Sequence, residues 1–257
     1  MFGTTPSLER FTKRWAITGT MAKASSKASA ITKASKSSNE KVEWTNVEID
    51  GILENLMPVT VPVSITVRGR QKILSFKECE ALLRKAKRIS LEPCWCRLKI
   101  KGCDAPVDIC VSMNREAELA VSEREGRHAT LQEAMEALKR GHRAGLVHLA
   151  YEDDAHELQA ICSCCSCCCH TLSAITRLGY DPAIVGHSDV VAVHVPGTCT
   201  NCGICVQRCH FKAWTTEGEK VKHNPELCAG CSVCVAFCPA GSIKLVKRDT
   251  KKMRMAK

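Results

Sequence analysis

The chain has 257 residues, 19 cysteines and a formal net charge of +10. A disulfide-rich secreted protein is disfavoured, because such proteins are usually short and carry a signal peptide, and residues 1–40 contain no long apolar segment. No run of about 18 apolar residues predicts a membrane-spanning helix. We therefore expect the cysteines to be thiolate ligands in a reducing compartment, the cytoplasm.

The positive charge is concentrated at the two ends of the chain. Residues 1–41 carry eight Lys or Arg residues against two acids, and residues 244–257 carry seven against one. The body between them is slightly acidic, and two Tyr and five Phe leave little to stack on bases. The charge pattern argues against nucleic-acid binding and leaves basic tails that can steer docking to an acidic partner.

Residues 1–41 are rich in Ser, Ala, Lys and Thr. This composition buries too little apolar surface to offset the entropy of ordering, so we expect a disordered basic extension. A transit peptide and a start codon assigned too far upstream are the alternatives. We expect a second basic tail over residues 247–257.

Residues 42–189 have the pattern of an α/β domain that is rich in cysteine. β-branched and apolar residues predict strands at 61–67, 145–151 and, leading into the next domain, 189–195. Capping-box spacing predicts helices over 76–89 and 131–140, capped by Ser75 with Glu78 and by Thr130 with Glu133. A further helix is expected over 170–179, closed by Gly179.

Two matching cysteine runs, 29 residues apart, lie near the C-terminus. Each has the form C-x2-C-x2-C-x3-C, the spacing of two cubane clusters in which the fourth cysteine of each run ligates the other run's cluster. One expected ligand set is Cys199, Cys202, Cys205 and Cys238, and the other is Cys228, Cys231, Cys234 and Cys209. A zinc site is the alternative, although its paired C-x2-C units do not explain a third C-x2 step.

Residues 190–246 resemble the bacterial dicluster ferredoxin family, on the strength of these runs and of Pro239 after Cys238. The resemblance implies a ferredoxin-like domain, two [4Fe-4S] clusters and the transfer of single low-potential electrons. The whole chain is then α+β. His210 follows Cys209 where the family usually has Pro. A His there can donate a hydrogen bond to a cluster sulfur, or it can be a surface substitution without consequence.

Eleven further cysteines precede residue 190. Cys79, alone on the expected 76–89 helix, is interpreted as a buried apolar residue. The first group of metal-ligand candidates, in a segment that Pro and Gly mark as loop, is Cys94, Cys96, Cys103 and Cys110. These four thiols suffice for one cubane, with zinc as the competitor, and Arg97 can neutralise part of the charge of a cluster.

The second group is denser, and consists of Cys162, Cys164, Cys165, Cys167, Cys168 and Cys169. Six thiols in eight residues cannot all bind one cubane, and without a ligand they are open to oxidation. Either some complete a cluster shared with the first group, or two clusters lie close together. We expect one or two additional iron–sulfur clusters, with His170 as a cap or surface residue.

Residues 85–246 also resemble a group of uncharacterised iron–sulfur proteins from anaerobic microbes, through their CxCR and ICxCCxCCC elements. That resemblance implies metal binding more than a particular reaction. No glycine-rich phosphate loop or hydrolase motif is present, so no small-molecule site is expected.

We expect an electron-transfer protein or subunit that serves a redox protein partner or a larger oxidoreductase complex. One alternative is a redox enzyme with a catalytic iron–sulfur centre at residues 164–169. The other is a protein for cluster storage, assembly or redox sensing.

Overall fold

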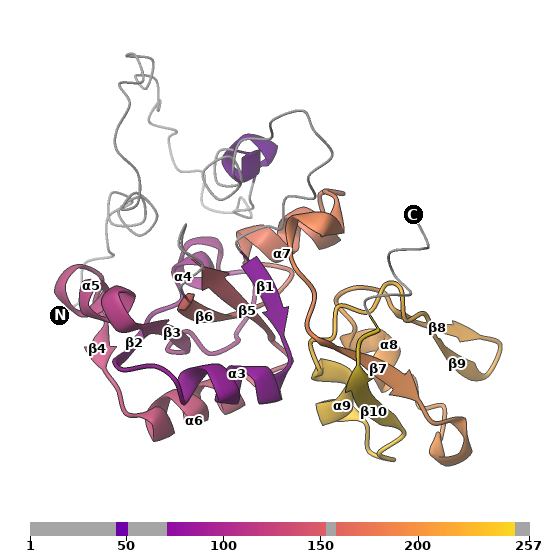
Figure 1. Cartoon of the computed structure of the whole chain (residues 1–257). Helices are drawn as coiled ribbons and strands as arrows, with labels where there is room; N and C mark the ends of the chain where they lie inside the picture. Colours follow the sequence, from indigo (N-terminus) through magenta and orange to yellow (C-terminus); the bar gives the residue numbers. More distant parts are fainter. Residues whose placement is uncertain (1–44, 51–70, 153–157, 250–257) are drawn as a thin grey trace, which may run out of the picture.

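A computed structural model describes residues 45–50, 71–152 and 158–249 (Figure 1). The predicted strand at 61–67, the basic extension over 1–41 and most of the basic tail lie outside the described residues. A six-stranded sheet has the order β1-β5-β6-β3-β2-β4, and all its neighbouring strands are antiparallel. Its strands are β1 (Gln71–Leu74), β2 (Ile89–Glu92), β3 (Cys110–Met113), β4 (Arg127–His128), β5 (Val147–Glu152) and β6 (Leu158–Cys164).

Helices cover both faces of this sheet (Figure 1). Leu83 of α3 (Phe76–Leu83) and Leu138 of α6 (Leu131–Arg143) pack with Ile161 of β6. The opposite face carries the cysteines of β3 and β6, and α4 (Trp95–Ile100) and α7 (His170–Thr176) pack on it, while α5 (Asn114–Glu123) packs against β2 and β3. Because side chains alternate along a strand, each strand supplies both layers. The protein is thus a mixture of helices and antiparallel sheets.

Both predicted capping boxes are present. The Ser75 and Thr130 hydroxyls accept hydrogen bonds from the backbone N–H groups of Glu78 and Glu133, whose carboxylates accept bonds from the N-cap N–H groups in return. Cys79 is fully buried on α3, as predicted.

The ends of the predicted helices differ from those observed. Helix α3 stops at Leu83, and the prediction that it continues to residue 89 is wrong because Ile89 begins β2 and pairs with Met113. Helix α7 stops at Thr176, three residues before Gly179, whose φ is +77°. The segment expected to be loop around Cys94 contains α4.

The C-terminal part has two small antiparallel sheets. Strand β7 (Val190–His194), which was predicted, pairs with β10 (Ile243–Lys247), and β8 (Trp214–Glu217) pairs with β9 (Lys220–His223). Two short helices, α8 (Ile204–Arg208) and α9 (Val233–Phe237), follow the loops of the two cysteine runs. None of the helices in the described ranges is both long and apolar enough to cross a membrane.

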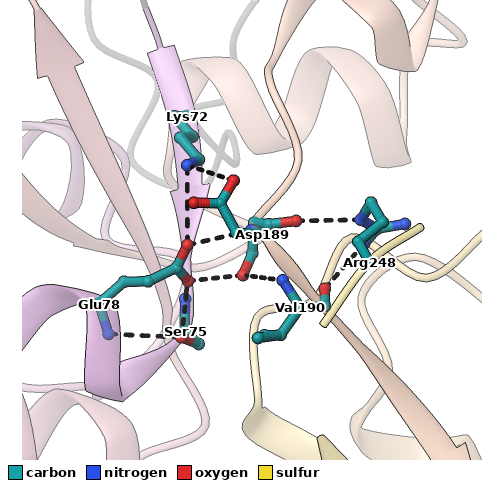
Figure 2. Close-up of polar contacts among 7 residues, drawn as sticks. Lys72, Ser75, Glu78, Asp189, Val190 and Arg248 are labelled. Carbon is teal, nitrogen blue, oxygen red and sulfur yellow. Dashed lines mark hydrogen bonds and ion pairs between the residues drawn. The ribbon is translucent and has the colours of Figure 1, made fainter. Parts of the chain in front are cut away.

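A polar junction joins the two parts, and Figure 2 shows it. The Glu78 carboxylate accepts hydrogen bonds from the Ser188 hydroxyl at 2.5 Å and from the Asp189 N–H at 3.0 Å. Lys72 Nζ lies 2.9 Å from the Asp189 carboxylate. The Arg248 guanidinium donates to the carbonyls of Ser188 and Val190, both at 3.0 Å. The start of α3, the connector at 188–190 and the residue after β10 are therefore tied together.

Candidate metal centres

The two C-terminal cysteine runs share one backbone conformation. Positive φ angles recur in pairs 29 residues apart, at Asn201 and Gly230, Gly203 and Ser232, and Lys212 and Gly241. Cys209 and Cys238 end α8 and α9 with nearly identical angles, φ −82° and −80° with ψ 106° and 107°. The sequence repeat is therefore a structural repeat.

The first quartet combines both runs. Cys199, Cys202 and Cys205 line one pocket together with Cys238, the last cysteine of the second run. Trp214 and Ile243 form part of its apolar wall. Cys202 is exposed, so this pocket is the one nearest to solvent among the groups of thiols. We call these four cysteines the first quartet.

The second quartet brings Cys209 to three cysteines of the second run. Burial raises the pKa of Cys231, and the neighbouring Cys234, Cys209 and Cys228 thiols raise it further. Burial, with help from Cys228 and Cys209, raises the pKa of Cys234 to about 12. The structure thus gathers Cys209, Cys228, Cys231 and Cys234, the second quartet, in a buried to partly buried environment where thiolates need a nearby positive charge.

Backbone amides point at the sulfurs of both quartets. Bonds of 3.2–3.5 Å run to Cys199, Cys209, Cys228 and Cys238 from the N–H groups of Asn201, Ala213, Ala192 and Ser242. Hydrogen bonds to sulfur favour the thiolate over the thiol and tune the potential of an iron–sulfur cluster. The donor set and its amide shell fit cluster ligation at both quartets.

A third group of thiols lines a pocket on the sheet face that carries the cysteines. Cys162 and Cys164 alternate along β6 and so project to the same side. The register that pairs Val111 with Ile161 sets Cys110 of β3 beside Cys162. We call this group the inner thiol pocket, and its members are Cys94, Cys96, Cys110, Cys162, Cys164 and Cys169.

Helix starts supply the remaining thiols of the inner pocket. Cys94 is the N-cap of α4, and Cys169 is the N-cap of α7. His170 is buried, with Nδ1 3.5 Å from Cys96 Sγ, so the expectation of a surface position is wrong. Tyr151 of β5 also lines this pocket. Tyr151 was missed, although the alternation of apolar residues along 147–151 would place it on the same face as Val147 and Leu149.

The thiols of the inner pocket perturb one another. A hydrogen bond with Cys110, followed by burial, raises the pKa of Cys94. A hydrogen bond from Cys164 lowers the pKa of Cys169 in spite of its burial, and the N–H groups of Leu172 and Thr171 add to the effect. Several thiolates can coexist in such a place only with a compensating cation, and bound metal ions supply that charge.

A fourth group lies beside the inner pocket. Cys103, from the loop after α4, meets Cys165, Cys167 and Cys168 from the turn after β6. Their four sulfur atoms all lie within 4.8 Å of one another. We call these four residues the compact quartet. Cys168 also lines the inner pocket, so the two groups adjoin.

Each of the two cysteine groups recognised in the sequence is therefore divided between two sites. Cys103 is separated from Cys94, Cys96 and Cys110, and the dense run of six divides into halves. Arg97 lies at the boundary, with Nη2 3.8 Å from Cys165 Sγ. The alternation of side chains along β6 could have predicted this division, because it puts Cys162 and Cys164 on one face. Using that signal requires knowing that the strand ends at Cys164.

His210 does not act on a cluster sulfur as one interpretation had it. Its Nδ1 lies 2.7 Å from the Ser166 hydroxyl, and its Nε2 lies 2.9 Å from the carbonyl oxygen of Gly145. Both ring nitrogens therefore bond to the N-terminal part. His210 is a contact between the two cysteine-bearing regions.

Comparison with known families supports the C-terminal part of this assignment. A family model described as a 4Fe-4S binding domain matches residues 221–244, which include Cys228, Cys231, Cys234 and Cys238. No curated protein matches the chain. The chain thus contains a ferredoxin-type iron–sulfur segment at its C-terminus, and this segment together with the cysteine groups fits a role in electron transfer.

Proposed function

We propose that the protein is an electron-transfer protein or subunit whose two C-terminal quartets hold [4Fe-4S] clusters and whose inner thiol pocket holds a third iron–sulfur cluster. The observation that carries the proposal is a continuous chain of thiol groups through the core. Cys231 of the second quartet packs against the hydrophobic cluster that contains Cys162, Cys164 and Cys169. Cys228 and Cys234 lie in the next cluster, against Cys205 and Cys238.

The exposure of the cysteines decreases from the first quartet to the inner thiol pocket, so electrons can enter at the first quartet. Cys202 in the first quartet is exposed, whereas Cys228 and Cys234 in the second are buried. All members of the inner pocket except Cys96 are buried. A redox protein partner would therefore exchange electrons at the first quartet, near the surface, and the inner pocket would be the terminal store.

The clusters, when bound, supply reversible one-electron chemistry. The chain's own residues position the sulfurs and keep water away. Val147 and Leu149 of β5 and Val233 of α9 belong to the hydrophobic cluster that contains thiols of the inner pocket and that Cys231 of the second quartet packs against. The Arg208 guanidinium lies 4.5 Å from the centre of the Phe237 ring, which brings positive charge close to the two C-terminal helices.

The test is a redox titration of the full chain purified without oxygen, together with iron and sulfide analysis. We expect about twelve irons per chain from three cubanes, and a reversible one-electron reduction of each cluster seen by electron paramagnetic resonance. Reduced protein should pass its electrons to a small soluble acceptor without any added substrate. Iron that cannot be reduced and reoxidised would sink the proposal.

A redox enzyme with its reaction centre in the inner pocket is the second candidate. The inner pocket has six member thiols besides Cys168 of the compact quartet, and a cubane takes four, so two are left to react with a substrate or form a disulfide. The burial of five of the six leaves little access for a substrate, and this favours electron transfer. A cluster spectrum that changes on addition of a small-molecule substrate would favour the enzyme instead.

A further inference from the structure

The spacing of the sulfurs in the compact quartet is unlike that of the two C-terminal quartets. Cys103 Sγ lies 3.7 Å from Cys165 Sγ and 4.0 Å from Cys168 Sγ, and the Cys167 and Cys168 sulfurs are 3.7 Å apart. Among the described residues, this is the group of cysteines whose sulfurs all lie within 4.8 Å of one another. The C-terminal quartets are more open.

The distance between ligand sulfurs differs between a single zinc ion and a cubane, so the sulfur spacing indicates which of the two a site can hold. Four thiolates placed tetrahedrally at 2.3 Å from one zinc ion are separated from each other by about 3.8 Å. In a cubane each thiolate binds a different iron at a corner of the cube, so the sulfurs must stand considerably farther apart. Three of the separations in the compact quartet are 3.7–4.0 Å and the others lie within 4.8 Å, so the spacing matches a single ion and is too close for a cubane.

The backbone is arranged to bring the four thiols this close. The turn at 166–168 is closed by a hydrogen bond from the Cys169 N–H to the Cys165 carbonyl at 3.1 Å. Gly102, next to Cys103, approaches that turn so closely that a Cβ there would lie 3.2 Å from Cys168 Sγ and 3.4 Å from Cys167 Cβ. A larger residue would push the loop and the turn apart.

A fixed positive charge accompanies the quartet. Arg97 is 2% exposed. Its guanidinium donates to the carbonyl oxygens of Pro106 and Ser163, which hold it in place, and Nη2 lies 3.8 Å from Cys165 Sγ. A divalent ion with four thiolates carries a formal charge of −2, so a buried guanidinium offsets part of that charge.

We propose that Cys103, Cys165, Cys167 and Cys168 bind one Zn²⁺ ion in a closed four-thiolate site. The ion fastens the loop after α4 to the turn after β6. That turn is flanked by Cys164 and Cys169, two members of the inner thiol pocket, so the zinc fixes the spacing of thiols that do not bind it. The proposal stands on sulfur geometry and does not depend on electron transfer by the clusters.

The first experiment is X-ray absorption at the zinc edge, with zinc and iron analysis, on the full chain expressed with both metals and purified without oxygen. We expect one zinc per chain with four sulfur neighbours at about 2.3 Å and no iron in the next shell. A chain without zinc, or zinc with nitrogen or oxygen neighbours, overturns the proposal. The reversible reduction of the clusters reports separately on the proposed function, so either proposal can fail alone.

The second experiment compares Cys103→Ala with Cys79→Ala. Cys79 is a buried cysteine that belongs to none of the four groups. Zinc should fall at least tenfold in Cys103→Ala and stay unchanged in Cys79→Ala, while the iron of the C-terminal quartets is kept in both. Cys167→Ala, at another partly buried ligand, repeats the test if Cys103→Ala does not fold. Loss of about four irons in place of zinc would show a cubane at this site.

Discussion

The C-terminal quartets and the N-terminal thiol groups both bring several cysteines together, but they use different parts of the backbone to do so. Each C-terminal run places three cysteines on a short loop and the helix that follows, and positive φ angles at matching positions shape both loops. The N-terminal groups draw on two strands, two helix starts, a loop and a turn. The spacing of the cysteines within each C-terminal run therefore depends on residues close together in the sequence. The N-terminal sites form only once the sheet has brought distant segments together.

This contrast separates the forces that each site depends on. A local loop keeps its ligand spacing as long as its own backbone is intact. The inner thiol pocket needs β3 and β6 in register, because a slip of one residue would turn Cys110 away from Cys162 to the opposite face. Damage to the sheet should thus empty the inner pocket and leave the C-terminal quartets loaded.

The largest effect is expected from Glu92→Ala, which removes a buried carboxylate from β2. Glu92 is cross-strand neighbour to Cys110 and accepts hydrogen bonds from the Ser112 hydroxyl and from Arg124 Nε at 3.2 Å. Both members of the Glu92–Arg124 pair have fully or almost fully buried side chains. Arg124 keeps the Glu116 carboxylate at 2.6 Å, so the cost comes from losing one of its two carboxylate partners and the acceptor of the Ser112 hydroxyl, together about 3–5 kcal/mol. Urea unfolding followed by circular dichroism, without oxygen, measures the loss.

Glu118→Ala is the matched control, since Glu118 forms an exposed ion pair with Arg88. Exposed pairs contribute about 0–1 kcal/mol, so its effect should be small. Iron analysis sharpens the result. Glu92→Ala should lose about four irons, those of the inner pocket, and keep those of the C-terminal quartets. Equal losses from all sites would contradict the separation between the two regions.

Gly230→Ala should have the next largest effect, and it tests how the second run is held. Gly230 has φ +78°, and a Cβ there would lie 2.1 Å from the Val190 carbonyl oxygen. Left-handed strain and the clash together should cost about 2–4 kcal/mol. Thermal unfolding of the metal-loaded protein gives the cost, and slower reconstitution of the clusters should accompany it.

Gly203→Ala is the control that separates the backbone strain from the clash, because Gly203 has φ +73° but nothing within 4 Å of the added Cβ. Only the strain applies there, about 1–2 kcal/mol. If the two variants were equally stable, the second run would not be packed against the connector at 188–190 as described.

The same contrast explains what sequence could and could not predict. The grouping of cysteines within each C-terminal run follows from local spacing, and both capping boxes follow from residues three apart. The division of the N-terminal thiols does not, since it depends on Cys110 opening a strand while Cys103 stays in a loop. The end of α3 was wrong for the same reason, because Ile89 is drawn into the sheet by pairing with Met113.

The smallest effect concerns the junction between the two regions, and it depends on pH. Burial alone would raise the pKa of Glu78, but hydrogen bonds from Ser188 and Ser75 and from the Asp189 N–H outweigh it and lower the pKa. Since the folded state favours the carboxylate, Glu78 stabilises the protein above its ordinary pKa of 4.5. That contribution disappears as the pH falls through the lowered value.

Glu78→Gln should therefore cost about 1–3 kcal/mol at pH 7, the range for hydrogen bonds to a charged group, and the gap to the unchanged protein should close below pH 4.5. Denaturant unfolding across this pH range checks both statements on the metal-free, reduced chain if it folds, and on the loaded chain otherwise.

Glu133→Gln is the matched control, because Glu133 holds the same position in the other capping box but faces solvent. The hydrogen bonds of the Glu133 carboxylate run to Thr130 and Arg127, both in the N-terminal part. If Glu78→Gln acted only through the capping box of α3, proteolytic cleavage would increase at α3 and not at the connector. Glu78→Gln should instead raise proteolytic cleavage at the 188–190 connector, since Ser188 and Asp189 lose the carboxylate that holds them to α3.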